Sequence, residues 1–428
     1  MALYSGVIGR LRGLVQRAIG FARRQTHDFR VMLARRALHG IGSGSGLSSQ
    51  YGSIYATLLG ADAVQLGSLG SVGNVISALA SIPTGWFIDY YSLKKVFLLG
   101  TVMLIGSRAL YFVAPHWAWL YAGAILYYLG MRITCTACTV TCATELPNEE
   151  RATGRGFCRT LSSIVAISTP LVAAGLISLS GGINLRGIRS LYAIEGLVFV
   201  GILVLLLTQL RGSRGSSVST GRQGIFSGFT EVFKHGPDVM RLVLVMGLME
   251  LPWTIAHPFM PLYARDFKGA DQYVLGAIAM ALTIVPMLTS IPLGRLADRY
   301  GRKKLLFALA PLAYLANLSL VLAPSEGAST LPFLLLYGVF FGVNSVNMAL
   351  VSSMAAEIVP KDQMGRWIGT ISLFKGLLGI PAPLIGGLIW EHIGPQYVFF
   401  AAIAVDLFLR LPLLASVRET LHLSPTSD

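Results

Sequence analysis

Long apolar runs, each about the length needed to cross a lipid bilayer, occupy most of this chain. A transmembrane helix needs about 20 apolar residues, because each residue advances the helix by only about 1.5 Å. Turn signals and charges divide the chain into about twelve such runs. The expected spans are 34–58, 63–88, 95–113, 117–144, 154–178, 189–210, 239–262, 272–296, 304–323, 331–356, 367–390 and 396–415. The sequence therefore predicts an all-α membrane protein with twelve transmembrane helices.

The composition favours lipid, not water, as the solvent around these runs. The chain is 54% hydrophobic and 13% charged, with a mean hydropathy of +0.65, whereas soluble domains carry about 25% charged residues. A soluble protein with such a surface would aggregate. The 47 glycines fit the same interpretation, since small residues let transmembrane helices approach closely.

Positive charge is concentrated at one end and in the gaps between the apolar runs. Residues 1–36 contain eight arginines and one acid, which supplies half of the formal net charge of +14. This pattern follows the positive-inside rule and argues against a nucleic-acid partner. Because an even number of spans puts both termini on one side, we expect a multi-pass protein of the cell (inner) membrane with cytoplasmic termini.

The start of the chain mixes arginine with apolar residues. Residues 1–30 therefore predict a basic amphipathic tail that lies in the cytoplasm or on the membrane surface. An arginine-rich, acid-poor start is also typical of an organellar transit peptide, and that alternative stays open.

The longest polar gap lies in the middle of the chain. Residues 211–238 are rich in Gly and Ser at their beginning, which is typical of a flexible linker. The predicted organisation is a tail (1–30), an N-terminal six-helix bundle (31–210), a cytoplasmic linker (211–238), a C-terminal six-helix bundle (239–415) and a cytoplasmic tail (416–428).

The second half of the chain repeats the first. Residues 81–95 read SIPTGWFIDYYSLKK, and 209 positions later residues 290–304 read SIPLGRLADRYGRKK. We call these the first and second strings. At the same offset GAD at 60–62 recurs at 269–271, and at an offset near 212 PLVAAGLI at 170–177 is echoed by PLIGGLIW at 383–390. Several matches in order indicate a duplicated unit.

The second string resembles a signature of the major facilitator superfamily, G-x-x-x-D-R-x-G-R-K/R. The matching residues are Gly294, Asp298, Arg299, Gly301, Arg302 and Lys303, with Arg295 and Lys304 beside them. The first string keeps Gly85, Asp89, Lys94 and Lys95 but has Tyr90 where the family has Arg. The resemblance covers about residues 30–415 and implies two pseudo-symmetric six-helix bundles that expose a central site alternately to either side.

Both strings are expected to act as cytoplasmic gates. Glycines allow close helix crossings, and an aspartate can face the positive N-terminus of a neighbouring helix. By resemblance, Asp89 would meet the helix that begins near Arg366, and Asp298 the helix that begins near Gly154. Further expected gating partners are Glu145, Arg155 and Glu357. The alternative is that these charges only set the topology.

Two ionisable residues in the seventh run stand out. Glu250 and His257 are seven positions apart, which places them two turns apart on one helical face. Burying an ionisable group in a membrane is costly, so such residues are functional candidates. We expect Glu250 and His257 to serve proton coupling or substrate binding; the alternative is a structural pair between Glu250 and an Arg or Lys. Pro252 and Pro258 are expected to loosen this helix.

Other polar residues inside the runs are further candidates for the central site. They are Arg132, Lys375, Gln50, Tyr51, Asn344 and Asn347. Asp406 and Arg410, one turn apart, indicate an internal ion pair, while Glu195 could serve either role. Cys135, Cys138 and Cys142 share one helical face near Cys158; thiols can bind a soft metal, but packing is the expected role and no metal is predicted.

No sequence signature of an enzyme or of nucleotide hydrolysis is present. We therefore expect no cofactor and a secondary active transporter that draws on a gradient, with protons as the coupling ion and a small molecule as substrate. The resemblance is to drug- and metabolite-exporting members, acting as a monomer surrounded by lipid. The alternative is a receptor or lipid-handling protein built on a transporter scaffold.

Overall fold

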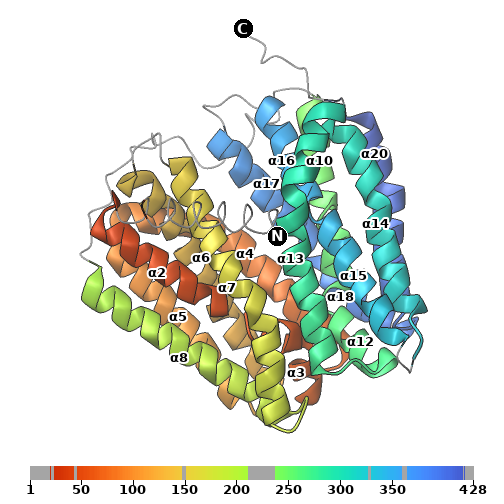
Figure 1. The fold of residues 1–428 in the computed structure, drawn as a ribbon, viewed down its shortest axis with the longest axis horizontal. Helices are drawn as coiled ribbons and strands as arrows, with labels where there is room; N and C mark the ends of the chain where they lie inside the picture. Colours follow the sequence, from red (N-terminus) through yellow and green to blue (C-terminus); the bar gives the residue numbers. More distant parts are fainter. Residues whose placement is uncertain are drawn as a thin grey trace, which may run out of the picture.

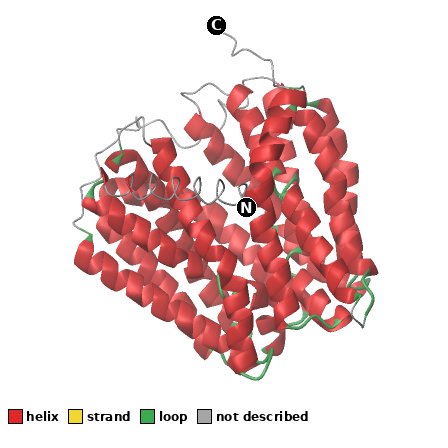
Figure 2. Cartoon of the chain, in the orientation of Figure 1, coloured by secondary structure: helices red, strands yellow, loops and turns green. Residues whose placement is uncertain are grey.

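The computed structural model describes residues 20, 24–42, 46–146, 151–210, 237–325, 329–358, 364–417 and 419. The side chains of 81–90, 155–156 and 355–370 lie outside this description, as do those of some single positions. Every regular element in the described part is helical (Figure 2). This confirms the predicted all-α class.

The first half of the chain forms one bundle, drawn from red to yellow-green in Figure 1. Its elements are α2 (His27–Gly42), η1 (Ser49–Tyr51), α3 (Gly52–Leu58), α4 (Ala63–Tyr90), α5 (Leu93–Val113), α6 (Trp119–Glu145), α7 (Arg151–Leu179) and α8 (Leu185–Gln209). Within it, α5 packs against α6 and α8, and α2 packs against α7 and α8.

The second half forms the other bundle, drawn from green to blue. Its elements are α10 (Pro237–Leu248), α11 (Leu251–Ala256), α12 (Met260–Lys268), α13 (Gln272–Tyr300), α14 (Arg302–Leu322), α15 (Thr330–Asn344), α16 (Asn347–Ile358), α17 (Met364–Gly379), α18 (Pro381–His392), α19 (Tyr397–Val405), η3 (Asp406–Arg410) and α20 (Leu411–Ser416). In the described part, 11 segments are long and apolar enough to cross a membrane. The interrupted segment 27–58 supplies the twelfth span.

Four of the spans are interrupted near their middle. The first breaks between Gly42 and η1, the seventh at 249–250 and 257–259, the tenth at 345–346, and the eleventh at Ile380. Prolines account for the interruptions in the seventh and eleventh spans, because proline lacks the N–H that a continuous helix needs. No proline marks the tenth.

The two bundles meet through a symmetric pair of helix crossings. Gly67 on α4 lies so close to α18 that an added Cβ would come within 2.3 Å of the Pro383 carbonyl oxygen. At the equivalent place Gly276 on α13 crosses α7, where a Cβ would lie 3.0 Å from the Pro170 carbonyl oxygen. Only glycine permits such backbone contact. Both crossings join residues that the internal repeat relates to each other.

These crossings close one end of the molecule, which we call the distal end. It carries the turns 59–62, 114–118, 180–184 and 269–271, and α3 meets α12 there, at the bottom of Figure 1. The Tyr51 hydroxyl donates to the Gln272 carbonyl at 3.1 Å, again between the bundles.

The opposite end, which carries the linker and both strings, we call the linker end. There α13 loses its neighbour: Leu288 and Ile291 are each 67% exposed. Further exposed residues follow on α13 as far as Tyr300, whereas Ala297 is buried and Leu293 packs against the core of the C-terminal bundle. A Cβ at Gly294 would meet no atom within 4 Å. Among the described residues, Gly294 at the linker end therefore has no close helix crossing of the kind that Gly67 and Gly276 make at the distal end.

A buried ion pair holds the broken first span in the N-terminal bundle. Glu195 accepts hydrogen bonds from the Ser48 N–H at 2.8 Å and the Ser48 hydroxyl at 2.9 Å, and its carboxylate lies 2.8 Å from Arg108 Nε. Arg108 Nη2 donates to the Gly42 carbonyl at 3.1 Å. The pair thus contacts both sides of the break. Fully buried, it fits the structural alternative for Glu195.

Replacing Gly67 by Val should force the distal end apart, because the Cβ would overlap a backbone oxygen that cannot move alone. We expect a loss of about 1–3 kcal/mol in stability and a longer distance between spin labels at His116 and Ser325, exposed on the two sides of the distal end. Gly201→Val is the control, since nothing lies within 4 Å of its Cβ position. Unchanged label distances in Gly67→Val would contradict this role.

Glu195→Gln should destabilise the protein by about 3–5 kcal/mol, because it leaves the buried Arg108 charge without its counter-ion. Thermal unfolding in detergent measures the effect. The double variant Glu195→Gln with Arg108→Gln should recover part of the loss, and Glu391→Gln, at an exposed carboxylate, should have none. A mild effect of Glu195→Gln would show that Arg108 finds another partner.

Candidate functional site

A cavity of about 490 Å³ lies between the two bundles. We call it the central cavity. Its walls come from α4 and α6 of the first bundle and from the seventh and eleventh spans of the second. Four predicted residues line it together: Arg132, Glu250, His257 and Lys375. The first and the last of these residues, Arg132 and Lys375, are more than 240 positions apart in the sequence. Only the fold brings the four side chains together.

Two charged groups of the central cavity, Glu250 and Lys375, lie at or near the interruptions in the seventh and eleventh spans. Glu250 occupies the turn between α10 and α11, just before Pro252. Lys375 lies on α17, four residues before that helix ends at Gly379. The Asn74 amide of α4 donates to the Gly379 carbonyl at 2.6 Å, which ties the end of α17 to the other bundle.

Glu250 and Lys375 form an ion pair inside the cavity. Lys375 Nζ lies 2.9 Å from Glu250 Oε1 and 3.0 Å from the Met348 sulfur. The side chains remain 32% and 20% exposed. A pair that water reaches can exchange partners at low cost, unlike a fully buried one. Glu250 thus pairs with a lysine, as its structural alternative predicted. The pair nevertheless faces the central cavity.

Two further residues complete the electrostatics of the cavity. The His257 ring lies 4.0 Å from the Trp253 ring, centroid to centroid, and is exposed. Arg132 has no ion-pair partner in the described part of the chain. Since Glu250 and Lys375 cancel, the cavity carries one unbalanced positive charge when His257 is neutral. That charge suits a ligand with an anionic or acceptor group.

The remaining polar candidates lie deeper or nearer the distal end. Gln50 Nε2 donates to the Pro170 carbonyl at 3.4 Å. Tyr51 takes part in the distal contact described above. Asn347 donates to Asn344 Oδ1 at 2.7 Å. Gln50, Asn344 and Asn347 line a second cavity, together with Glu250 and His257; most of its walls come from the C-terminal bundle, and Ser49, Gln50 and Pro170 of the first bundle complete it.

The second string adopts a defined structure at the linker end. Asp298 is 67% exposed and lies 3.6 Å from Arg302 Nη2. Arg295, Arg299 and Lys304 are exposed. No contact of Asp298 with the helix that contains Gly154 occurs among the described residues. The expected gate contact therefore remains a prediction for a closed linker end.

Gly301 has a role that the signature alone does not reveal. Its φ of +105° requires glycine, and it allows the Glu419 carboxylate to approach the start of α14. Glu419 accepts hydrogen bonds from the Arg302 N–H at 3.1 Å and the Lys303 N–H at 3.0 Å. Lys303 Nζ donates to the Ala415 and Val417 carbonyls at 2.7 and 2.6 Å. A negative cap at a helix N-terminus is favourable.

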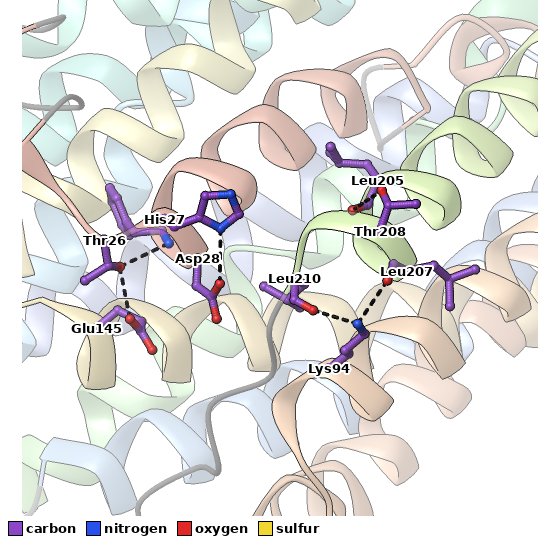
Figure 3. A network of polar contacts seen from close by, with 10 residues as sticks. Thr26, His27, Asp28, Lys94, Glu145, Leu205, Leu207, Thr208 and Leu210 are labelled. Atoms are coloured by element: carbon purple, nitrogen blue, oxygen red, sulfur yellow. Dashed lines mark hydrogen bonds and ion pairs between the residues drawn. The ribbon is translucent and has the colours of Figure 1, made fainter.

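The first string is described in part. Lys94 Nζ donates to the carbonyls of Leu207 (3.0 Å) and Leu210 (2.6 Å), as Figure 3 shows, and so neutralises the negative end of α8. Lys95 is exposed. Glu145 accepts a hydrogen bond from the Thr26 hydroxyl at 3.0 Å.

Other gate residues belong to helices whose side chains at these positions are not described. Gly85 and Asp89 lie on α4, Arg155 on α7, Glu357 on α16 and Arg366 on α17. Their side-chain contacts lie outside the described residues, so their gating roles remain predictions.

The cysteines lie in a packed environment. Cys142 and Cys158 are buried with Phe29, Leu33 and Leu146, whereas Cys135 is exposed. Among the described residues no group of three or more His, Cys, Asp or Glu side chains is arranged to hold a metal. This arrangement favours the packing interpretation.

Sequence reasoning missed several residues that line the cavities. Asn74 and Tyr128 line the central cavity, and Tyr314 and Asn317 line the second one, where the predicted Asp406–Arg410 pair also lies. The available signal was a polar side chain within an apolar run, which Asn74 and Asn317 both give.

Comparison with known proteins agrees with this architecture. A family profile described as Major Facilitator Superfamily matches residues 37–269 and 242–422. The chain is 24% identical over 338 residues to the multi-drug resistance efflux pump PmrA of Streptococcus pneumoniae, covering 77% of this chain and 80% of that protein. It is 25% identical over 191 residues to the class B tetracycline resistance protein of Escherichia coli.

The tetracycline resistance match covers 44% of this chain and 46% of that protein, so it spans about half of the relative. Among solved structures, the nucleoside transporter NupG (D323A mutant) superimposes with a TM-score of 0.71 at 14% identity, covering 92% of this chain and 100% of that one. Similarity at that identity establishes the fold. With the family profile matched over both bundles, the chain belongs to the major facilitator superfamily.

Proposed function

We propose that this protein is a secondary active transporter that carries a small organic molecule through the central cavity. The observation that carries the proposal is the Glu250–Lys375 ion pair, which faces a cavity between two symmetric bundles beside Arg132, a residue with no ion-pair partner among the described residues. A transporter needs a site of this kind, reached first from one side and then from the other. A receptor would not need an exchangeable intramembrane charge pair.

Transport would require the bundles to pivot about the central cavity. The glycine crossings close the distal end, and among the described residues Gly294 and Asp298 make no such contact at the linker end; this arrangement supports a state open to the cytoplasm, with the termini on that side. In the opposite state the distal glycine crossings would part, and the strings would meet the helix ends near Gly154 and Arg366. An ionic contact worth about 1–3 kcal/mol would bias this equilibrium without locking it.

Protons would couple to the substrate through Glu250. A cationic or donor group of the substrate would displace Lys375 from the unprotonated Glu250 carboxylate, while Arg132 holds an acceptor group of the same molecule. A proton that binds Glu250 on the other side of the membrane would displace the substrate, so that proton and substrate cross in opposite directions. His257, on the same wall, would pass the proton between Glu250 and water.

Drug export across the cell membrane is the proposed physiological direction. The efflux and resistance activities named for the relatives support it, as does a cavity wall that combines charges with Trp253 and Tyr128. One chain supplies both bundles, so a monomer would suffice, with both termini in the cytoplasm.

Proteoliposomes with an imposed pH gradient test the coupling. With tetracycline and ethidium as probes, the wild-type protein should show gradient-driven transport, and Glu250→Gln should lose it because the variant cannot bind and release the proton. Exchange without a gradient should persist. Glu391→Gln is the matched control. Gradient-driven transport by Glu250→Gln at the wild-type rate would remove Glu250 from the coupling.

The gate is tested by Asp298→Asn with spin labels at Lys95 and Lys304, which are exposed on the two sides of the linker end. Loss of the carboxylate should reduce the population with a short label distance by about 5- to 150-fold. Asp266→Asn, at an exposed carboxylate of α12, should leave the distances unchanged. Equal populations in Asp298→Asn and wild type would refute the gate.

A further inference from the structure

All four cysteines of the chain lie on two neighbouring helices of the N-terminal bundle. Cys135, Cys138 and Cys142 are on α6, and Cys158 is on α7. Their exposure falls in that order, because Cys135 is exposed, Cys138 is half-buried, and Cys142 and Cys158 are only 4% and 5% exposed. Packing explains the burial of these thiols, but it does not explain the charge that lies beside them.

The charge is Arg35 on α2, a helix that packs against both α6 and α7. Arg35 is 1% exposed, and its Nε and Nη1 have no hydrogen-bond partner among the described residues. Its guanidinium carbon lies 4.6 Å from the centre of the Phe97 ring. Such a contact recovers only part of the cost of taking a cation out of water. The surroundings of Arg35 therefore need a negative group.

In the described part of the chain, no carboxylate is among the ionisable groups that act on Arg35. These groups are the thiols of Cys135, Cys138 and Cys158 and the guanidinium of Arg36. The anion that such neighbours can supply is a thiolate, which is also the reactive form of cysteine. The position of Arg35 thus indicates a reactive thiol group and not a merely packed one.

The arrangement of the helices selects which two thiols can be joined. The Cys142 thiol forms hydrogen bonds with the thiols of Cys138 and Cys158. Cys138 and Cys142 are four positions apart on one helix, where Cβ atoms lie about 5–6 Å apart, whereas a disulfide needs about 3.5–4.5 Å. The same limit excludes Cys135 with Cys138. Cys142 and Cys158 come from different helices and share one buried cluster with Phe29, so a small helix shift can join them.

We propose that a hydroperoxide oxidises Cys142 and Cys158 to a reversible disulfide between α6 and α7. The Cys158 thiolate, beside Arg35, attacks the terminal peroxide oxygen and forms a sulfenic acid. The O–O bond breaks, and the other oxygen takes up the thiol proton and leaves as an alcohol, or as water from hydrogen peroxide. The Cys142 sulfur then attacks the sulfenic sulfur, and water leaves with the second thiol proton. The two sulfurs together transfer two electrons to the peroxide.

The disulfide joins the two helices near the linker end. Cys142 lies three residues before the end of α6 at Glu145, and Cys158 lies seven residues after the start of α7 at Arg151. A small neutral peroxide therefore has little protein to cross. Both helix ends carry expected gating residues, so oxidation would fix their spacing. The reaction itself does not depend on the transport proposal, because it needs only the thiol pair and Arg35.

The test is oxidation of the full chain in nanodiscs with hydrogen peroxide, followed by unfolding with N-ethylmaleimide and mass spectrometry of the unreduced peptides. We expect peptides joined through Cys142 and Cys158 that separate after treatment with dithiothreitol. Cys142→Ser and Cys158→Ser should each abolish this product, and Cys135→Ser should leave it unchanged. The absence of the product in the wild type, or a main product that links Cys135 to Cys138, would overturn the proposal. So would the same mixture of pairings when the chain is unfolded before oxidation, because the fold would then not select the pair.

The role of Arg35 is tested by the rate at which the joined peptides appear. Arg35→Gln should slow the reaction by about tenfold, because it removes the charge that stabilises the thiolate. Arg35→Lys should restore most of the rate, since it keeps the charge. Arg30→Gln, at an exposed position of the same helix, is the matched control and should react as wild type. A wild-type rate in Arg35→Gln, or no rescue by Arg35→Lys, would refute the electrostatic role of Arg35.

Discussion

The two glycine crossings at the distal end are the contacts on which the arrangement of this molecule depends. Gly67 against Pro383 and Gly276 against Pro170 bring backbone to backbone between the bundles. Because both crossings lie at the distal end, they join the two bundles there, and no such crossing occurs at Gly294 of the linker end among the described residues. The central cavity is the space that results.

The membrane-embedded charges differ in how far water reaches them, and this separates their roles. Arg108–Glu195 is almost completely buried and contacts backbone on both sides of a broken span. Asp406–Arg410 is similarly buried, and Arg410 Nη1 has no hydrogen-bond partner among the described residues. Glu250–Lys375 alone among these three is reached from an open cavity. Desolvation makes the first two costly to break, whereas the third can exchange its partners.

Much of the architecture could be predicted from the sequence, because span length and the internal repeat are strong local signals. The predicted boundaries 63–88 and 272–296 agree closely with Ala63–Tyr90 and Gln272–Tyr300. Arg132, Glu250, His257 and Lys375 do line one cavity. The break at 345–346 and the distal position of Tyr51 were not predictable. A span surrounded by lipid and other helices is apolar on every side, so its sequence does not reveal which face meets which neighbour.

The cap that Glu419 places on α14 has a practical consequence for work with this protein. Removing the chain from residue 419 onward would uncover two backbone N–H groups of the second string and take away the carboxylate that caps α14. A truncated version would thus carry an altered signature segment even though every signature residue is intact. Purification tags and fluorescent fusions are therefore better attached with the sequence through Glu419 retained.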